Sequence, residues 1–97
     1  MVFQIILNVT ARKEIQESFH WYELRQSGLG LRFINAIEKR FDFLSKTPDI
    51  FPVKSSGFRE ALVVDFPFSI IYKINSKQNT VKVFHVFHTR RNPNLKK

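Results

Sequence analysis

The sequence reads FSIIYKI at residues 68–74 and VKVFHVFH at residues 81–88, with the segment NSKQN between them at residues 75–79. Both outer runs are dense in β-branched and aromatic residues, which favour strands, whereas the middle segment consists of residues typical of turns. The pattern predicts a β-hairpin that ends next to a cluster of histidine and arginine residues.

An apolar run at residues 2–9 precedes the first segment with helical spacing. Such a run is typical of a strand covered on both faces, so we expect it in the interior of a sheet. Thr10 can cap a helix that begins at Ala11, and Glu14 would then lie in the first turn, where the helix dipole favours a carboxylate. The residues SGLG at 27–30 should end this helix, because glycine readily adopts the left-handed conformation.

A second helix is predicted over residues 31–45, since one of its faces is apolar and the other polar, and Pro48 stops it. The link between the helices is short, so they should form an antiparallel hairpin. Residues 49–57 are expected as a loop and residues 58–65 as a strand. The order β-α-α-β-β-β predicts an α+β fold, in which the helical hairpin packs on one face of a mainly antiparallel four-stranded sheet. Residues 1–97 should form a single domain.

The composition argues against several classes of protein. The chain has no cysteine, which excludes a disulfide framework, and its three histidines match no metal-ligand pattern. Its three glycines form no phosphate-binding loop. The N-terminal apolar run is far shorter than the ~20 residues that span a bilayer, and it lacks the basic leader of a signal peptide. We therefore expect a cytoplasmic protein without a metal, a cofactor or a membrane partner.

The positive charge is concentrated in one part of the chain. Residues 1–38 carry equal numbers of basic and acidic groups, so residues 39–97 account for the entire net charge of +8. This distribution suits an acidic partner, either a protein or a nucleic acid, and it also fits plain solubility.

Alternation along the last predicted strand places Lys82, Phe84, Val86, His88 and Arg90 on one face. That face is too polar to lie wholly under helices, so we expect it on the open side of the sheet, with Phe84 and Val86 as an apolar strip. The residues expected to bind a target or partner are Lys73, Lys82, Phe84, Val86, His88, Arg90 and Arg91.

Two other residues are expected to serve the structure. His85 shares the opposite face with Phe87 and should be a buried or edge-packed histidine. Arg59 begins a strand, and we expect it to pair with Asp65 or Glu60.

Taken together, several segments resemble the RelE/ParE superfamily of bacterial toxins from type II toxin-antitoxin systems. The matching features are a short first strand, a first helix with a Trp-Tyr pair, a second helix ending before a proline, FRE at residues 58–60, DFPFSIIYKI at residues 65–74 and HVFHTRRNP at residues 85–93. The resemblance covers nearly the whole chain, and the F-P-aromatic-x-I-x-Y-x-I strand followed by H-x-x-R-x-P is fairly specific in combination. It implies the RelE/ParE toxin fold and a small acidic antitoxin as the partner.

This superfamily contains ribosome-dependent messenger-RNA endonucleases of the RelE type and ParE-like toxins that target DNA gyrase. RNA cleavage without a metal needs cations that hold the scissile phosphate and groups that transfer protons. The resemblance aligns Glu60 and Leu62 with lysines of the RelE branch, and Ser69 with an arginine. Only His88 and Arg90 remain as candidate catalytic residues, so the ParE-like branch is favoured.

Three functions stay open from the sequence. The leading expectation is a toxin that inhibits growth by binding an intracellular target, gyrase by resemblance, and that an antitoxin neutralises. The alternative is an endonuclease that acts with the ribosome on messenger RNA, in which Arg90 binds phosphate and His88 transfers the proton. A non-toxic relative that only binds an antitoxin is the third. A homodimer and a toxin-antitoxin hetero-oligomer are both compatible with the sequence.

The tail at residues 90–97 carries four positive charges and no acidic group. We expect it to be mobile beyond Pro93, and an acidic partner could order it through Arg90 and Arg91. Deleting residues 94–97 should leave the melting temperature nearly unchanged and weaken partner binding, more so at low salt.

Overall fold

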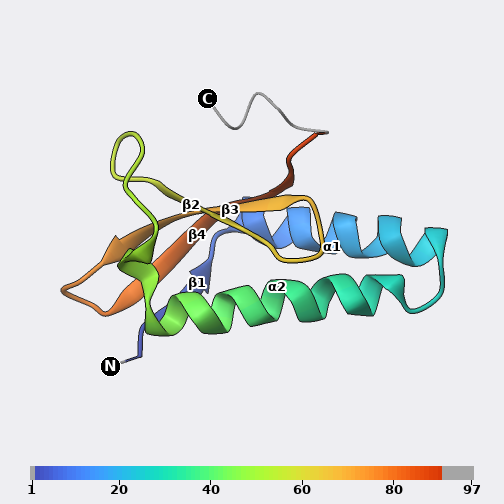
Figure 1. Cartoon of the computed structure of the whole chain (residues 1–97), viewed down its shortest axis with the longest axis horizontal. Helices are drawn as coiled ribbons and strands as arrows, with labels where there is room; N and C mark the ends of the chain where they lie inside the picture. Colours follow the sequence, from blue (N-terminus) through green and yellow to red (C-terminus); the bar gives the residue numbers. More distant parts are fainter. Residues whose placement is uncertain (1, 91–97) are drawn as a thin grey trace.

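The structure, a computed structural model, describes residues 2–90. In chain order these residues form β1 (Gln4–Leu7), α1 (Val9–Arg25), α2 (Leu29–Lys46), the short 3-10 helix η1 (Pro48–Ile50), β2 (Arg59–Leu62), β3 (Phe68–Asn75) and β4 (Thr80–His88). Figure 1 shows α1 and α2 side by side on one face of the sheet. The predicted α+β fold and the order of its elements are confirmed.

The four strands lie in the order β1-β4-β3-β2. β3 pairs antiparallel with both β2 and β4, whereas β1 runs parallel to β4 at one edge. A parallel pair needs a long crossover connection, and the two helices form the first part of the connection from β1 to the other strands. The two central strands are β3 and β4, which form the predicted β-hairpin.

β1 is an edge strand, and the prediction of an interior strand is wrong. Its residues alternate between exposed and half-buried, so only one of its faces is covered. The apolar run that suggested two covered faces is divided between β1 and the start of α1, where Val9 is 71% exposed. A continuous apolar run does not by itself report how many faces of a strand are covered.

α1 begins earlier than predicted, and Thr10 is not its cap. The cap is Asn8, whose Oδ1 accepts a hydrogen bond from the amide of Ala11 at 2.8 Å. Glu14 consequently lies beyond the first turn. Its carboxylate accepts a hydrogen bond from the amide of Val86 at 2.8 Å and supports the edge of β4 instead of the helix dipole.

Glu23 ties together the turn between the two helices. Its carboxylate accepts hydrogen bonds from the amides of Gly28 at 2.9 Å and Gly30 at 3.0 Å. Gly28 caps α2 with a φ of 88°, a left-handed conformation that glycine adopts without strain. A Cβ atom at Gly30 would lie 2.8 Å from the carbonyl oxygen of Phe19, so the two helices approach closely here.

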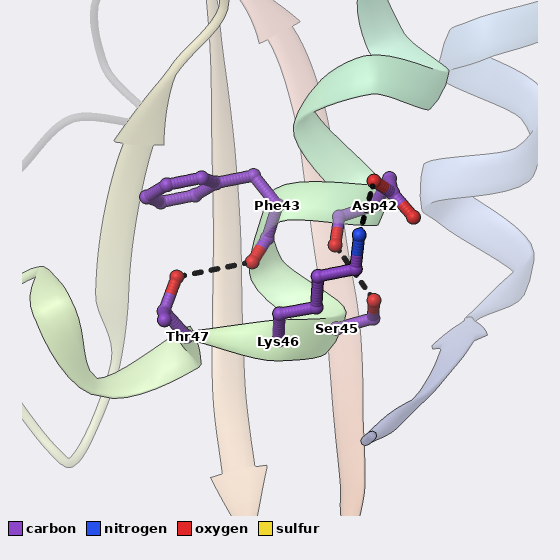
Figure 2. Close-up of polar contacts among 5 residues, drawn as sticks. All are labelled: Asp42, Phe43, Ser45, Lys46 and Thr47. Carbon is purple, nitrogen blue, oxygen red and sulfur yellow. Dashed lines mark hydrogen bonds and ion pairs between the residues drawn. The ribbon is translucent and has the colours of Figure 1, made fainter. Parts of the chain in front are cut away.

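Figure 2 shows the C-terminal turn of α2. The hydroxyl of Thr47 donates to the carbonyl of Phe43 at 3.2 Å, and that of Ser45 donates to the carbonyl of Asp42 at 2.7 Å. Lys46 forms an ion pair with the Asp42 carboxylate at 3.2 Å. The two hydroxyls thus provide donors for backbone carbonyls at the helix end, and the proline that follows prevents a further regular turn.

A β-bulge interrupts the pairing of β3 with β4. Tyr72 lies opposite Val83 and Ile71 lies opposite His85, which leaves Phe84 without a partner on β3. A bulge adds one residue to one strand and so shifts the alternation of the side chains that follow.

The core lies between the hairpin and the helices. β3 and β4 contribute side chains that are at most 1% exposed, namely Phe68, Ile70, Tyr72, Val81, Val83 and Val86. The ring of Phe33 from α2 packs on that of Phe68 with 4.8 Å between centroids. The hydroxyl of Tyr72 donates to the carbonyl of Pro48 at 2.7 Å, and burial raises the pKa of Tyr72 to about 12, because the phenolate would lose its hydration.

Candidate functional site

The bulge separates the predicted binding residues onto two faces of the sheet. Val86 is fully buried on the helix-covered face, and His88 lies opposite Phe68, a core residue of that same face. The prediction that Val86 and His88 lie on the open face is wrong, because strict alternation fails beyond Phe84.

The open face carries a group of four side chains, Phe58, Lys73, Lys82 and Phe84, which we call the lysine–phenylalanine cluster. The rings of Phe58 and Phe84 meet edge to face with 5.1 Å between centroids. The Nζ atom of Lys73 lies 4.3 Å from the Phe58 centroid, and that of Lys82 lies 5.3 Å from the Phe84 centroid. Such packing places each ammonium near the face of a ring while the stem of the lysine covers apolar surface. The cluster therefore offers cationic and apolar contacts side by side.

Phe58 was not among the predicted binding residues. It lies just before β2, and its position next to Phe84 depends on the pairing of β2 with β3. The sequence indicated only that Phe58 and Glu60 lie on the same face of a strand. It did not indicate which strand's side chains Phe58 would contact.

The carboxylate of Glu60 lies on the same face as the cluster. It accepts a hydrogen bond from the hydroxyl of Ser69 at 2.5 Å and pairs with Lys54 at 3.0 Å. Its side chain is only 8% exposed, and Ser69 is fully buried. The open face thus combines two lysines with a carboxylate held in one position.

The two candidate catalytic residues lie where β4 ends. The ring of His88 packs edge-on against Phe68 with 5.3 Å between centroids, and its Nδ1 accepts a hydrogen bond from the amide of Arg90 at 3.1 Å. Arg90 is exposed, whereas Arg91 lies outside the described residues. The catalytic role of His88 and Arg90 stays a prediction.

His85 is half-buried at the edge of β4, where its Nδ1 lies 3.4 Å from a carboxylate oxygen of Glu14. Arg59 has the structural role that was expected, but with different partners. Its guanidinium donates to the carbonyls of Phe51 at 2.5 Å and Asp49 at 3.3 Å, so the predicted pairing with an acidic side chain is wrong.

Within residues 2–90, no three histidine, aspartate or glutamate side chains come together in a group that could hold a metal ion. In the same part of the chain, none of the helices has the length and apolar character needed to cross a membrane.

The chain thus combines a helical hairpin on one face of a four-stranded sheet with basic and aromatic side chains on the other face. The family model described as the ParE toxin of the type II toxin-antitoxin system, parDE, matches residues 5–93. The chain belongs to this family. No curated protein matches it in sequence.

Three solved structures show the same fold. The chromosomal ParDE toxin-antitoxin system from P. aeruginosa superposes with a TM-score of 0.77 at 12% identity, covering 90% of this chain and 96% of that chain. For the RelBE2 complex from Mycobacterium tuberculosis the TM-score is 0.65 at 17% identity, with 91% and 99% covered. For the RelBE complex from E. coli it is 0.63 at 15% identity, with 87% and 93% covered. These similarities confirm the predicted RelE/ParE fold.

Proposed function

We propose that this ParE-family chain inhibits growth by binding a protein target, DNA gyrase by its similarity to ParE toxins, and that a small acidic antitoxin neutralises it. The proposal concerns the target and the mode of action, and it favours binding over cleavage of RNA.

The observation that carries this proposal is the carboxylate of Glu60 on the open face. The resemblance aligns Glu60 with a lysine of RelE-type endonucleases and Ser69 with an arginine. Here the two side chains are hydrogen-bonded to each other at 2.5 Å, so neither replaces the missing cations. A carboxylate at this position repels a scissile phosphate and cannot stabilise the charge that develops during its transfer.

The lysine–phenylalanine cluster supports an acidic protein as the partner. Carboxylates of such a partner can contact Lys73 and Lys82, while its apolar side chains cover the rings of Phe58 and Phe84. A disordered acidic segment that folds on contact would use both kinds of interaction. The similar RelBE2 and E. coli RelBE structures are complexes of a toxin with an antitoxin.

Induced expression tests the proposal directly. We expect growth to stop, purified gyrase to lose supercoiling activity in the presence of the chain, and transcripts to remain uncut. Co-expression of a small acidic protein encoded by the neighbouring gene should restore growth. The double variant His88→Ala/Arg90→Ala should remain toxic, because neither residue belongs to the lysine–phenylalanine cluster.

The alternatives predict different results. Cut transcripts that disappear in the His88→Ala/Arg90→Ala variant would replace this proposal with the RelE-type endonuclease. Normal growth after induction, together with tight binding of the adjacent acidic protein, would replace it with a non-toxic relative.

A further inference from the structure

A second basic surface lies along α2. It is a groove of about 500 Å³ between this helix and the loop that joins β2 to β3, and it shares no residue with the lysine–phenylalanine cluster. We call it the α2 groove. Its cations are Arg32, Lys39 and Arg40, and its apolar floor includes Ala36, Phe43 and Phe66. In Figure 1 the β2–β3 loop lies directly beside α2.

The three cations of the groove have no carboxylate partner within residues 2–90. The guanidinium of Arg40 lies 5.1 Å from the ring centroid of Phe43 and 5.7 Å from that of Phe51, and its Nε atom is buried without an acceptor. A buried donor that makes no hydrogen bond is costly. Arg40 as a whole is half-buried, so a carboxylate from outside would contact its terminal guanidinium nitrogens and not this Nε atom.

The nearby acidic residues compensate this positive charge only in part, and Glu38 and Asp42 line a neighbouring pocket together with Lys39. Asp42 pairs with Lys46 at 3.2 Å, and Figure 2 shows its side chain and the ring of Phe43 pointing to different sides of α2. Asp65 lines the groove, and among the described lining residues it opposes three cations with one carboxylate. Arg32 and Arg40 are therefore the cations of the groove that most favour an anionic group from outside.

The walls of the groove are held by the core. The ring of Phe66 packs edge to face on Tyr22 at 5.1 Å and on Phe33 at 5.6 Å. The loop is closed by a hydrogen bond from the amide of Val63 to the carbonyl of Phe68 at 2.9 Å. A preformed wall of this kind lowers the ordering cost that a ligand must overcome.

The spacing of the cations defines the ligand. Arg40 follows Arg32 by eight residues, which corresponds to about 12 Å along a helix at ~1.5 Å per residue. Glutamates two turns apart on a peptide helix have nearly the same separation, and an apolar side chain between them would meet the ring of Phe66. The apolar floor favours a peptide, because a nucleic-acid backbone brings phosphates without aliphatic side chains to fill it.

We propose that the α2 groove binds an acidic amphipathic helical segment of a partner protein, with carboxylates on Arg32 and Arg40 and an apolar side chain on Phe66. This inference goes beyond the proposed toxin function, since it assigns a second binding surface and does not depend on the identity of the target.

Fluorescence anisotropy of the full chain with a labelled synthetic peptide tests the proposal. The probe is a helical peptide of about 14 residues with two glutamates two turns apart and leucines between them. The groove variant is Arg32→Glu/Arg40→Glu, which changes the two cations that the proposal uses. The matched control is Arg12→Glu/Lys13→Glu, which changes the net charge equally at exposed positions of α1. We expect affinity to fall about tenfold or more in the groove variant and to stay within about twofold in the control.

Two further measurements distinguish binding in the groove from binding elsewhere on the chain. The same peptide with glutamines in place of glutamates should bind at least about tenfold more weakly. The variant Lys73→Glu/Lys82→Glu, which alters only the lysine–phenylalanine cluster, should bind the probe as well as the control does. The toxin function can therefore fail while the groove proposal stands, or the reverse.

Equal losses in the groove variant and the control would overturn the proposal, because net charge alone would then explain binding. A single-stranded RNA that competes for the groove and binds more tightly than the peptide would overturn it in favour of a nucleic acid. If the groove variant does not fold, Arg32→Gln/Arg40→Gln against Arg12→Gln/Lys13→Gln replaces the pair. Amide shifts of α2 in the unsubstituted chain, on addition of the peptide, report the same contact.

Discussion

On the helix-covered face of the β3–β4 hairpin, Phe68 and Val86 are at most 1% exposed, whereas on the open face Lys82 is exposed and Phe84 is only half-buried. The covered face stabilises the fold by removing apolar surface from water. The open face keeps aromatic rings under lysine ammonium groups at the surface, an arrangement that adds little to stability. The two faces of one hairpin therefore differ: one forms the core, and the other carries the side chains that we propose to bind a partner.

The boundary between these roles depends on a single residue. Because Phe84 is the extra residue of the bulge, Val83 and Val86 both face the core although three positions separate them. The bulge thus allows one short strand to contribute to the core at both ends and still present Phe84 to the open face.

The largest effect should come from deleting one residue of the regular part of β4. Deletion of Lys82 shifts one part of the strand by one position relative to β3. Either Val81 or the residues that follow position 82 then turn to the wrong face. We expect the chain to lose its cooperative thermal transition, measured by circular dichroism. Deletion of Phe84 is the control, because it leaves Val83 and His85 opposite their present partners. Equal unfolding in both variants would show that the bulge does not divide the faces in this way.

Truncating one phenylalanine on each face compares the two sides directly. Phe68→Ala removes a ring that is 1% exposed, and it should lower the free energy of unfolding by about 3–5 kcal/mol. Phe84→Ala, the same change on the open face, should cost about 1 kcal/mol, since its ring is already partly in water. Urea titration measures both, and similar losses would contradict the distinction between a folding face and a binding face.

Tyr72→Phe tests the only buried hydroxyl contact that joins β3 to η1 among the described residues. Loss of its hydrogen bond to Pro48 should cost about 1 kcal/mol near neutral pH. Burial raises the Tyr72 pKa from 10.0 to about 12, so between these values the folded chain keeps a proton that the unfolded chain releases. Stability should therefore fall as pH rises from 10 to 12.

The Tyr72→Phe variant lacks this ionisation, so the difference in unfolding free energy between the two proteins should narrow over that pH range. Lysines that titrate there affect both proteins alike and cancel in the comparison. Parallel stability curves from pH 9 to about 12 would contradict the assigned pKa.

The smallest effect on stability is expected for Lys73→Met on the open face. Its ammonium lies 4.3 Å from the Phe58 ring centroid, and an exposed contact of this kind contributes about 0.5 kcal/mol. Binding of the acidic antitoxin, measured by calorimetry, should weaken clearly, while Lys77→Met in the β3–β4 turn serves as the control of equal charge. A loss of affinity that is the same for both variants would place the partner elsewhere.

Much of the fold could be predicted because it follows from local patterns. One face of the second helix was expected to be apolar, and its residues Phe33, Ile37 and Leu44 are all buried. The start of α1 was harder to place, since Asn8 and Thr10 are both good caps and only the path of the chain after β1 selects between them.

The candidate site could be predicted only in part. Lys82 and Phe84 were assigned correctly to the open face, because they precede or form the bulge. Lys73 was expected among the binding residues, and the structure places it on the same face. Phe58 was missed, since its contact with Phe84 is made between β2 and β4, two strands that are separated by β3 in the sheet.

The sequence by itself determined the order of the elements, the hairpin, the amphipathic faces of the helices and the concentration of positive charge after residue 38, since each is a local pattern of residue types. Only the tertiary structure decided that β1 is an edge strand, that β4 has a bulge at Phe84 and that Val86 and His88 face the helices. The reason is physical: the face on which a side chain lies depends on which backbone groups pair across strands, and one unpaired residue reverses that relation for all the residues after it.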